Sequence, residues 1–216
     1  MPDFPYGLGR WSWGDERDLG HLMSSKAFTS VTAAPRTAQI WRPGVVLDQG
    51  QTPQCVAYAW KGLLQASPYR QGRRMSEAFV YEWAQQHDEW PGEAYEGTSV
   101  RAGAKFLQGL GFLAEYVWCF DAASLKNWIL RRGPAVLGTA WFDGMFTPTD
   151  GLVVPSGELV GGHAYLCVGY SGEQFQFVNS WGEGWGDDGE FSMAEAHVDW
   201  LLKNHGEACA PAEQVI

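Results

Sequence analysis

The sequence predicts an α+β protein with a helical lobe followed by a lobe built on an antiparallel sheet. Runs with apolar residues at helical spacing come first, and runs rich in β-branched and aromatic residues come after them. Helices and strands that are segregated along a chain are typical of α+β folds. The chain has 216 residues, of which 45% are hydrophobic, so it can bury a large core and is not a disordered protein.

The composition also divides the chain into an arm and a body. Residues 1–40 are rich in Gly, Pro, Ser and Thr, which predicts an N-terminal arm that packs on the body without a core of its own. Residues 41–216 are expected to form one domain. Its helical lobe would span about 50–120 and its β lobe about 121–216.

Three helices are expected in the first lobe. Apolar residues recur at helical spacing over 55–64, and Pro68 ends that run. Ser76 is a candidate N-cap for a helix over 76–86. A third run covers 99–110 and is closed by a glycine.

The second lobe opens with a helix over 122–132, for which Asp121 is a candidate N-cap. A glycine and a proline then lead into a strand over 135–142. The expected sheet consists of that strand, a strand opening at His163, a strand ending at Asn179 and residues 190–193. A last helix is expected over 193–204.

Cys55 stands where a helix is expected to begin, six residues after Gln49. A thiol is a nucleophile only as the thiolate, and a helix N-terminus beside a cationic imidazole lowers the thiol pKa. Cys55 is therefore a candidate nucleophile. The alternative is that it is a small buried apolar residue of its helix.

Two further residues could complete such a site. A glycine pair, Gly161 and Gly162, exposes His163 at the start of its strand, and the next strand carries Asn179 to a Gly/Trp turn. Neighbouring antiparallel strands could place Asn179 beside His163. Taken singly, each has an ordinary structural alternative: a buried histidine, a turn asparagine and, for Gln49, a solvated loop side chain.

Three ordered motifs resemble the papain-like cysteine peptidases: DQGQTPQC, GGHAYLCVGY and NSWGEGWGDDGEF. The resemblance runs from about Gln49 to Phe191 and is closest in style to prokaryotic and phage members that lack the usual pro-region. It implies a papain-like fold of two lobes with the active site in the cleft between them. The arm is too short for the helical pro-region of secreted members, so either no such zymogen is made or the arm itself covers the groove.

The resemblance implies a role for each residue of the motifs. Cys55 would be the nucleophile, His163 the general base and Asn179 the group that orients the imidazole. Gln49 and the backbone N–H of Cys55 would form the oxyanion hole. Trp181 would shield the hydrogen bond between Asn179 and His163 from water.

Substrate-binding residues are also implied by the resemblance. Gly97 lies near the glycine that pairs with substrate backbone, and Trp141 and Gly162 are candidates for the main specificity pocket. Space at Gly162 and an apolar wall at Trp141 favour a hydrophobic substrate side chain. Strand packing and turn geometry are the alternative reasons for these residues.

The expected function is hydrolysis of peptide bonds through an acyl-enzyme. The alternatives are a transferase or ligase with the same Cys-His chemistry, and a catalytically silent module with a binding or structural role in a larger assembly. No cofactor is expected, and no metal, because the four cysteines form no C-x-x-C pair. Cys119 and Cys167 lie in apolar, strand-like runs and are expected to remain reduced.

Charge and hydropathy restrict the expected partners to peptides or proteins. A net charge of −10 argues against nucleic acid and anionic membrane surfaces. Residues 1–20 lack the apolar segment of a signal peptide, and no apolar run approaches 18 residues. A location in the cytoplasm or within a particle such as a virion is therefore expected, while the oligomeric state is not indicated.

Overall fold

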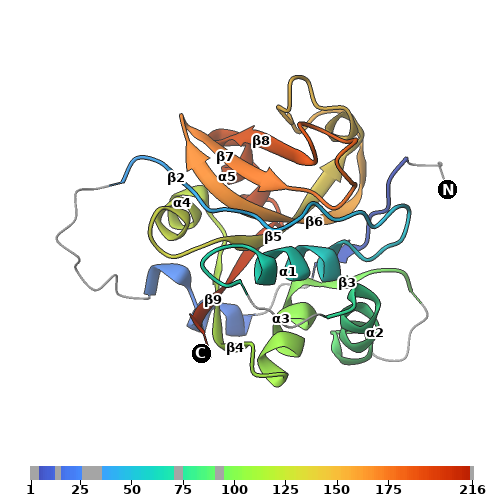
Figure 1. Cartoon of the computed structure of the whole chain (residues 1–216), viewed down its shortest axis with the longest axis vertical. Coiled ribbons are helices and arrows are strands. Elements are labelled where there is room, and N and C mark those ends of the chain that lie inside the picture. Colours follow the sequence, from blue (N-terminus) through green and yellow to red (C-terminus); the bar gives the residue numbers. More distant parts are fainter. Residues whose placement is uncertain (1–4, 13–15, 26–35, 71–74, 91–94, 215–216) are drawn as a thin grey trace.

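The computed structural model describes residues 5–12, 16–25, 36–70, 75–90 and 95–214 (Figure 1). In this part of the chain, a group of helices lies against one side of a large antiparallel sheet, and the two groups form two lobes (Figure 1). The expected α+β architecture is confirmed. The region between the lobes contains Cys55 from one side and His163 from the other.

The helical lobe consists of α1 (Cys55–Gln65), α2 (Glu77–His87) and α3 (Val100–Gly109). Helix α1 lies along the boundary with β6 (Figure 1), and its buried face includes Trp60 and Leu63. At the start of α3 the Ser99 hydroxyl accepts a hydrogen bond from the Ala102 N–H. The residue before α1, Gln54, makes no side-chain hydrogen bond to the first N–H groups of this helix.

The sheet of the second lobe has the strand order β4-β9-β5-β6-β7-β8, and β2 pairs with β6 beside this path. All of its named pairings are antiparallel. The strands are β2 (Gln39–Ile40), β4 (Leu113–Cys119), β5 (Ala135–Phe142), β6 (Leu159–Ser171), β7 (Gln174–Val178), β8 (Glu190–Ala194) and β9 (Glu207–Gln214). Helices α4 (Ala122–Arg131) and α5 (Glu195–Lys203) belong to this lobe, as does the short 3-10 helix η3 (Asp143–Phe146).

Two strands depart from the expected division of the lobes. β4 lies within residues 50–120 but pairs with β9, so the sheet takes a strand from the half of the chain assigned to helices. β9 was not expected, because its residues EACAPAEQ have low β-propensity. It is held from both sides, by β4 and by β5. Tertiary pairing therefore overrides local preference here.

Two hydrophobic clusters stabilise the lobes and meet at the cleft. One lies between the sheet and helices α4 and α5 and contains the fully buried Trp128 and Tyr165. The other joins α1 and α3 to the sheet and contains Trp60 and Phe106. Burial of one large apolar side chain stabilises the folded state by roughly 1.5–3 kcal/mol. Cys55 belongs to the second cluster and so has a rigid setting.

The described parts of the N-terminal forty residues lie against the body. β1 (Arg10–Trp11) pairs in parallel with β3 (Thr98–Ser99). The short 3-10 helices η1 (Glu16–Gly20) and η2 (Met23–Ser25) follow, and Leu22 forms a bridge to Trp118 of β4. The boundary between arm and body at residue 40 stays a prediction. In the described residues no helix is long and apolar enough to cross a membrane.

Candidate active site

Cys55 is the first residue of α1 and has no exposed surface. Burial raises the pKa of the Cys55 thiol to about 11, and the neighbouring backbone of Ala164, Gly9 and Val56 and the Arg10 charge only partly oppose the rise. The thiol is therefore protonated near neutral pH in this state of the molecule.

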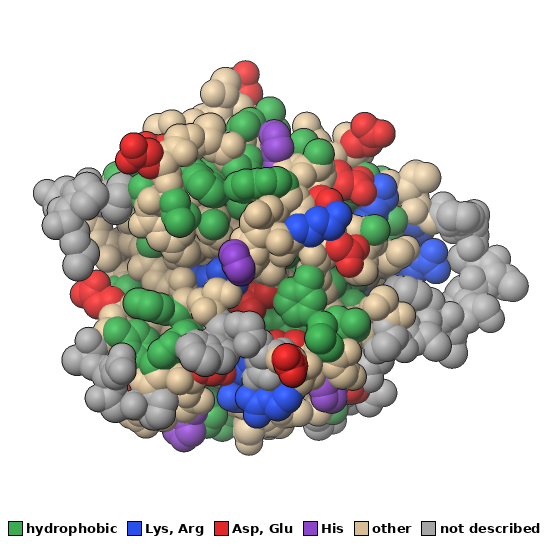
Figure 2. All heavy atoms as spheres, turned by 180° about the vertical axis from the view of Figure 1, so that it is seen from behind, with side chains coloured by type: hydrophobic (Ala, Val, Ile, Leu, Met, Phe, Trp, Pro, Cys, Tyr) green, Lys and Arg blue, Asp and Glu red, His purple; other side chains and the backbone are tan. Residues whose placement is uncertain are grey.

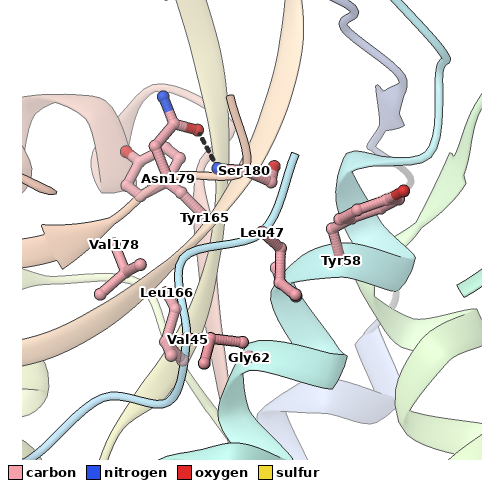
Figure 3. A pocket seen from close by; sticks show the side chains of 10 residues that line it. Val45, Leu47, Tyr58, Gly62, Tyr165, Leu166, Val178, Asn179 and Ser180 are labelled. Carbon is pink, nitrogen blue, oxygen red and sulfur yellow. Dashed lines mark hydrogen bonds between the residues drawn. The ribbon is translucent and has the colours of Figure 1, made fainter. Parts of the chain in front are cut away.

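His163 lies in β6 and is also fully buried. Its Nε2 atom is 2.8 Å from Asn179 Oδ1, which also accepts a hydrogen bond from the Ser180 N–H at 2.8 Å (Figure 3). Burial lowers the pKa of His163 to about 4, and the hydrogen bond to Asn179 opposes this. The imidazole is therefore neutral near pH 7.

The second ring nitrogen of His163, Nδ1, has no hydrogen-bond partner among the described residues. Its neighbour in sequence, Ala164, interacts with the Cys55 thiol, so the thiol and the imidazole belong to one site. No hydrogen bond joins Cys55 to His163 in the part of the chain that the structure describes. Asn179 therefore occupies one nitrogen of the ring, and Nδ1 is the nitrogen that remains available.

Two tryptophans enclose the histidine. The Trp181 ring stacks on the His163 ring with centroids 4.5 Å apart and planes at 24°. Trp141 meets the same ring edge-on at 4.9 Å. Both tryptophans are buried, and the shielding of the bond between His163 and Asn179 by Trp181 stays a prediction. Trp141 has no exposed surface, so it lies behind the histidine and not on the wall of a groove.

Gln49 is buried, and its amide orientation is fixed by hydrogen bonds. Its Oε1 accepts a bond of 2.6 Å from the Ser180 hydroxyl, and its Nε2 donates to the Thr52 carbonyl at 2.6 Å. The segment around Gln49 pairs with the segment around Trp181, because Asp48 and Trp181 form an antiparallel bridge. This pairing places Gln49 beside the end of β7 and near the start of α1.

The arm passes through the cleft and covers Cys55. The Gly7 carbonyl accepts hydrogen bonds from Gln49 Nε2 at 3.2 Å and from Trp181 Nε1 at 3.3 Å. The Gly9 N–H donates to the Gly162 carbonyl at 3.2 Å, and the Gly9 carbonyl accepts from the Thr98 N–H at 2.8 Å. The arm is thus bonded as an extended peptide to both walls.

Alternating glycines allow this close approach. A Cβ atom at Gly7 would lie 2.2 Å from the Thr52 carbonyl oxygen, and one at Gly9 would lie 2.2 Å from the Pro53 carbonyl oxygen. Both contacts are far below van der Waals distance and involve backbone atoms, which cannot move aside cheaply. Residues with side chains therefore cannot occupy these two positions of the arm in its present path.

The predicted substrate-binding glycines both contact the arm. A Cβ at Gly97, whose φ is +104°, would lie 2.3 Å from the Gly9 carbonyl oxygen. A Cβ at Gly162 would lie 2.1 Å from the Arg10 carbonyl oxygen. The structure therefore brings Gly97 and Gly162 together on one extended peptide, whereas Trp141 is buried beside His163. Their role toward a substrate stays a prediction.

The remaining space is small near the site and larger beside the arm. A groove of ≈ 840 Å³ is lined by arm residues 8–11, by Tyr95 and Glu96, and by residues 160–162. Beside Tyr58 and Gly62 of α1, a cavity of ≈ 20 Å³ is bordered by Leu47, Asn179 and Ser180 (Figure 3). That volume suits one water molecule at most. Among the described residues no group of His, Cys, Asp or Glu is placed to hold a metal ion.

Several residues of the site were not expected from sequence. Ser180 orients Gln49, and the arm residues Gly7, Gly9 and Arg10 fill the cleft, where Arg10 bonds to Glu207. The signal that could have found the arm is the pattern Gly-Leu-Gly-Arg, since two glycines spaced by two suggest a strand that approaches another backbone closely. Ser180 and Glu207 have no such local signal.

A family model for papain family cysteine proteases matches residues 63–211, which is more than half of the chain. The chain belongs to the papain family. The matched segment includes His163 and Asn179 and begins after Gln49 and Cys55. The family assignment made from the three motifs is confirmed.

Individual relatives are distant. An uncharacterised peptidase C1-like protein of Acanthamoeba polyphaga mimivirus is 29% identical over 116 residues, which are 50% of this chain and 37% of that protein. The match therefore spans little more than a third of that relative's length.

Solved structures show the same fold. Xylellain, a cysteine protease from Xylella fastidiosa, has a TM-score of 0.75 at 21% identity, with both chains covered completely. Bromelain from Ananas comosus, in complex with the E64 inhibitor, has a TM-score of 0.62 at 14% identity and covers 82% of this chain and 98% of its own. At such identities the likeness establishes the papain-like fold.

Proposed function

We propose that this protein is a cysteine peptidase and that the form described here is latent, because its own arm occupies the active site. One observation carries the proposal: an extended peptide lies across Cys55, with a carbonyl oxygen 3.2 Å from Gln49 Nε2. A cleft that binds the backbone of its own chain in this way suits the backbone of a peptide substrate.

The mechanism begins when the arm leaves and water enters the cleft. The burial that raises the Cys55 pKa and lowers the His163 pKa is then relieved, so the proton can pass from the thiol to Nδ1 of His163. Cys55 attacks the substrate carbonyl and forms an acyl-enzyme. His163 then gives its proton to the leaving amine and activates the water that releases the product.

The other residues stabilise charge in these steps. Asn179 Oδ1 accepts the Nε2 proton of His163 and thereby holds the ring in one orientation. Gln49 donates a hydrogen bond from Nε2 to the oxyanion, and one such donor lowers the activation barrier by about 3 kcal/mol. In the latent form the Gly7 carbonyl takes that donor.

The buried thiol also favours a second candidate function, a catalytically silent module whose cleft is closed permanently. The peptidase and the silent module differ in whether the arm can leave the cleft. A transferase or ligase would use the same residues and differ in the acceptor of the acyl group. The proposed partners are peptides or proteins. On the face shown in Figure 2, basic and acidic side chains of the described residues lie next to one another.

The test expels the arm in the full-length protein. In Gly9→Val the side chain would collide with the Pro53 carbonyl, whereas in the control Gly20→Val it enters open space, because nothing lies within 4 Å of a Cβ there. We expect Gly9→Val to cleave a protein substrate and to react with an epoxide probe at Cys55, and the control to behave as the unaltered protein.

Two further variants in the Gly9→Val background separate chemistry from access. Cys55→Ser should abolish both cleavage and labelling, and His163→Ala should abolish cleavage. A folded Gly9→Val protein whose Cys55 reacts no faster than Cys119 and cleaves nothing would support the silent module and rule out the peptidase. Product formed on an added amine in preference to water would indicate the transferase.

A further inference from the structure

Arg10 is an arm residue whose charged side chain is buried in the body. Its side chain is 4% exposed, and that of its partner Glu207 is 10% exposed. Arg10 Nη2 donates to Glu207 Oε1 at 3.0 Å and to the His205 carbonyl at 2.9 Å, and Nε donates to the same Oε1 at 3.3 Å. The guanidinium is therefore bound on two sides inside the protein.

The pocket around Arg10 has space for a long side chain because two of its walls are glycines. A Cβ at Gly138 of β5 would lie 2.7 Å from Arg10 Nε and 2.8 Å from Val100. A Cβ at Gly162 of β6 would meet the Arg10 backbone. Gly138 is the register partner of Glu207, so the sheet itself sets the carboxylate at the base of this space.

The carboxylate at the base depends on Arg10 for its neutralisation. Burial raises the pKa of Glu207, and the charge of Arg10 opposes that rise. Another cation, Arg101, is near, but it pairs with Asp18 and Glu89. A buried carboxylate without a bonded partner is costly, so the pocket favours an occupant that brings a positive charge when the arm is absent.

The pocket also has a fixed place relative to the thiol. Gly9, the residue before Arg10, lies against the backbone of Pro53, two residues before Cys55, and its backbone acts on the pKa of the Cys55 thiol. Arg10 itself pairs with Thr98 and crosses Gly162. The side chain in the pocket therefore belongs to a residue one position along the chain from the peptide unit at Cys55, which is within the reach of a substrate's specificity residue.

We propose that the pocket formed by Glu207, Gly138 and Val100 selects an arginine side chain of the substrate next to the residue at Cys55, and that Arg10 of the arm imitates this side chain. The inference rests on the proposed peptidase function. It differs from the hydrophobic preference expected from sequence, because the residue at the base of the pocket is an acid and Trp141 is not part of its wall. Lysine, a single point charge, fits the forked contacts to Glu207 and His205 less well.

The experiment uses the full-length double variant Gly9→Val/Arg10→Ala, in which the arm is expelled and the pocket is vacated. The substrates are fluorogenic peptides that differ only in the residue whose side chain would enter the pocket, which is arginine, citrulline, norleucine or glutamate. Citrulline has nearly the shape of arginine without its charge. We expect kcat/KM for arginine to exceed that for citrulline and norleucine by at least about tenfold, since a hydrogen bond to a charged group is lost.

Glu207→Gln in the same background should remove the preference for arginine over citrulline. The matched control is Glu96→Gln, which neutralises another carboxylate that lines the groove beside the arm and should leave the preference unchanged. Equal loss in both variants would mean that general electrostatic attraction and not the pocket selects arginine. That result would overturn the proposal.

A binding measurement keeps this proposal separate from the peptidase proposal. The same peptides are titrated into the double variant, and protection of Cys55 from iodoacetamide is measured. If Cys55 reacts with the epoxide probe and peptides are cleaved, but arginine and citrulline are treated alike, the pocket proposal fails and the peptidase stands. If nothing is cleaved but the arginine peptide alone protects Cys55, the pocket stands and the peptidase fails.

Discussion

Replacement of Arg10 by alanine should open the cleft of the full-length protein. Arg10 forms charge-assisted hydrogen bonds to Glu207 and to the His205 carbonyl, all of them buried. A hydrogen bond to a charged group contributes about 1.5–3 kcal/mol, so the loss of this set shifts the equilibrium toward the open form by about 3 kcal/mol. That free energy corresponds to about a hundredfold increase in the open population.

The assay is the rate of Cys55 alkylation by iodoacetamide, followed by peptide mapping. If the cleft opens and closes faster than alkylation, the rate is proportional to the open population, so Arg10→Ala should label about a hundredfold faster. The control is Arg36→Ala, which removes an exposed arginine bonded to Gln39 and should have no effect. An unchanged rate in folded Arg10→Ala would refute the view that this ion pair holds the arm.

Two other outcomes follow from the site. Burial lowers the pKa of His163 to about 4, so between that pH and the ordinary pKa near 6.5 the unfolded chain binds one proton more than the folded protein. The free energy of unfolding should therefore rise with pH in this window. His163→Gln should flatten that part of a pH profile measured by denaturant unfolding, and an unaltered slope would contradict the burial of a neutral ring. Ser180→Ala removes the hydrogen bond that orients Gln49. In the Gly9→Val background it should slow acylation by about tenfold, because the oxyanion donor is misplaced. Ser156→Ala, at an exposed serine, is the control, and equal acylation rates in the two variants would show that Ser180 has no positioning role.

Much of the fold could be predicted because its signals are local. The helix that begins at Cys55 was placed correctly at its start, and the strand over 135–142 was placed within its observed bounds. The last helix begins at Glu195, two residues after the expected start, since residues up to Ala194 remain paired in β8. Periodicity cannot report where a strand stops and a helix takes over within one apolar run.

The features that were not predicted depend on contacts between distant parts of the chain. β9 exists because β4 and β5 flank it, and its own alanines and proline give little indication of a strand. The pairing of Arg10 with Glu207 joins residues separated by 197 positions. Trp141 was expected in a pocket from the family resemblance, yet alternation along the strand turns its ring into the core beside His163.

The same reasoning separates the site residues. Gln49, Cys55, His163 and Asn179 could be chosen as candidates because each belongs to a motif that spans only a few residues. The expectation that His163 is exposed at the start of its strand was wrong, because β6 begins at Leu159 and the histidine is buried within it. The convergence of the four residues in one cleft could be expected from the resemblance to a known fold. Whether the arm covers the cleft was left open by the sequence, because the path of the arm is decided by glycine contacts with Thr52 and Pro53 rather than by its own periodicity.

An occupant that is covalently attached to the molecule it blocks behaves differently from a free inhibitor. The local concentration of a tethered segment is set by the length of its connection, typically in the millimolar range, and does not fall when the protein is diluted. Dilution would therefore not release activity, and a competing peptide would have to exceed that local concentration or bind more tightly than Gly7–Arg10. Cutting or pulling the connection, in contrast, would turn the molecule on in a single step.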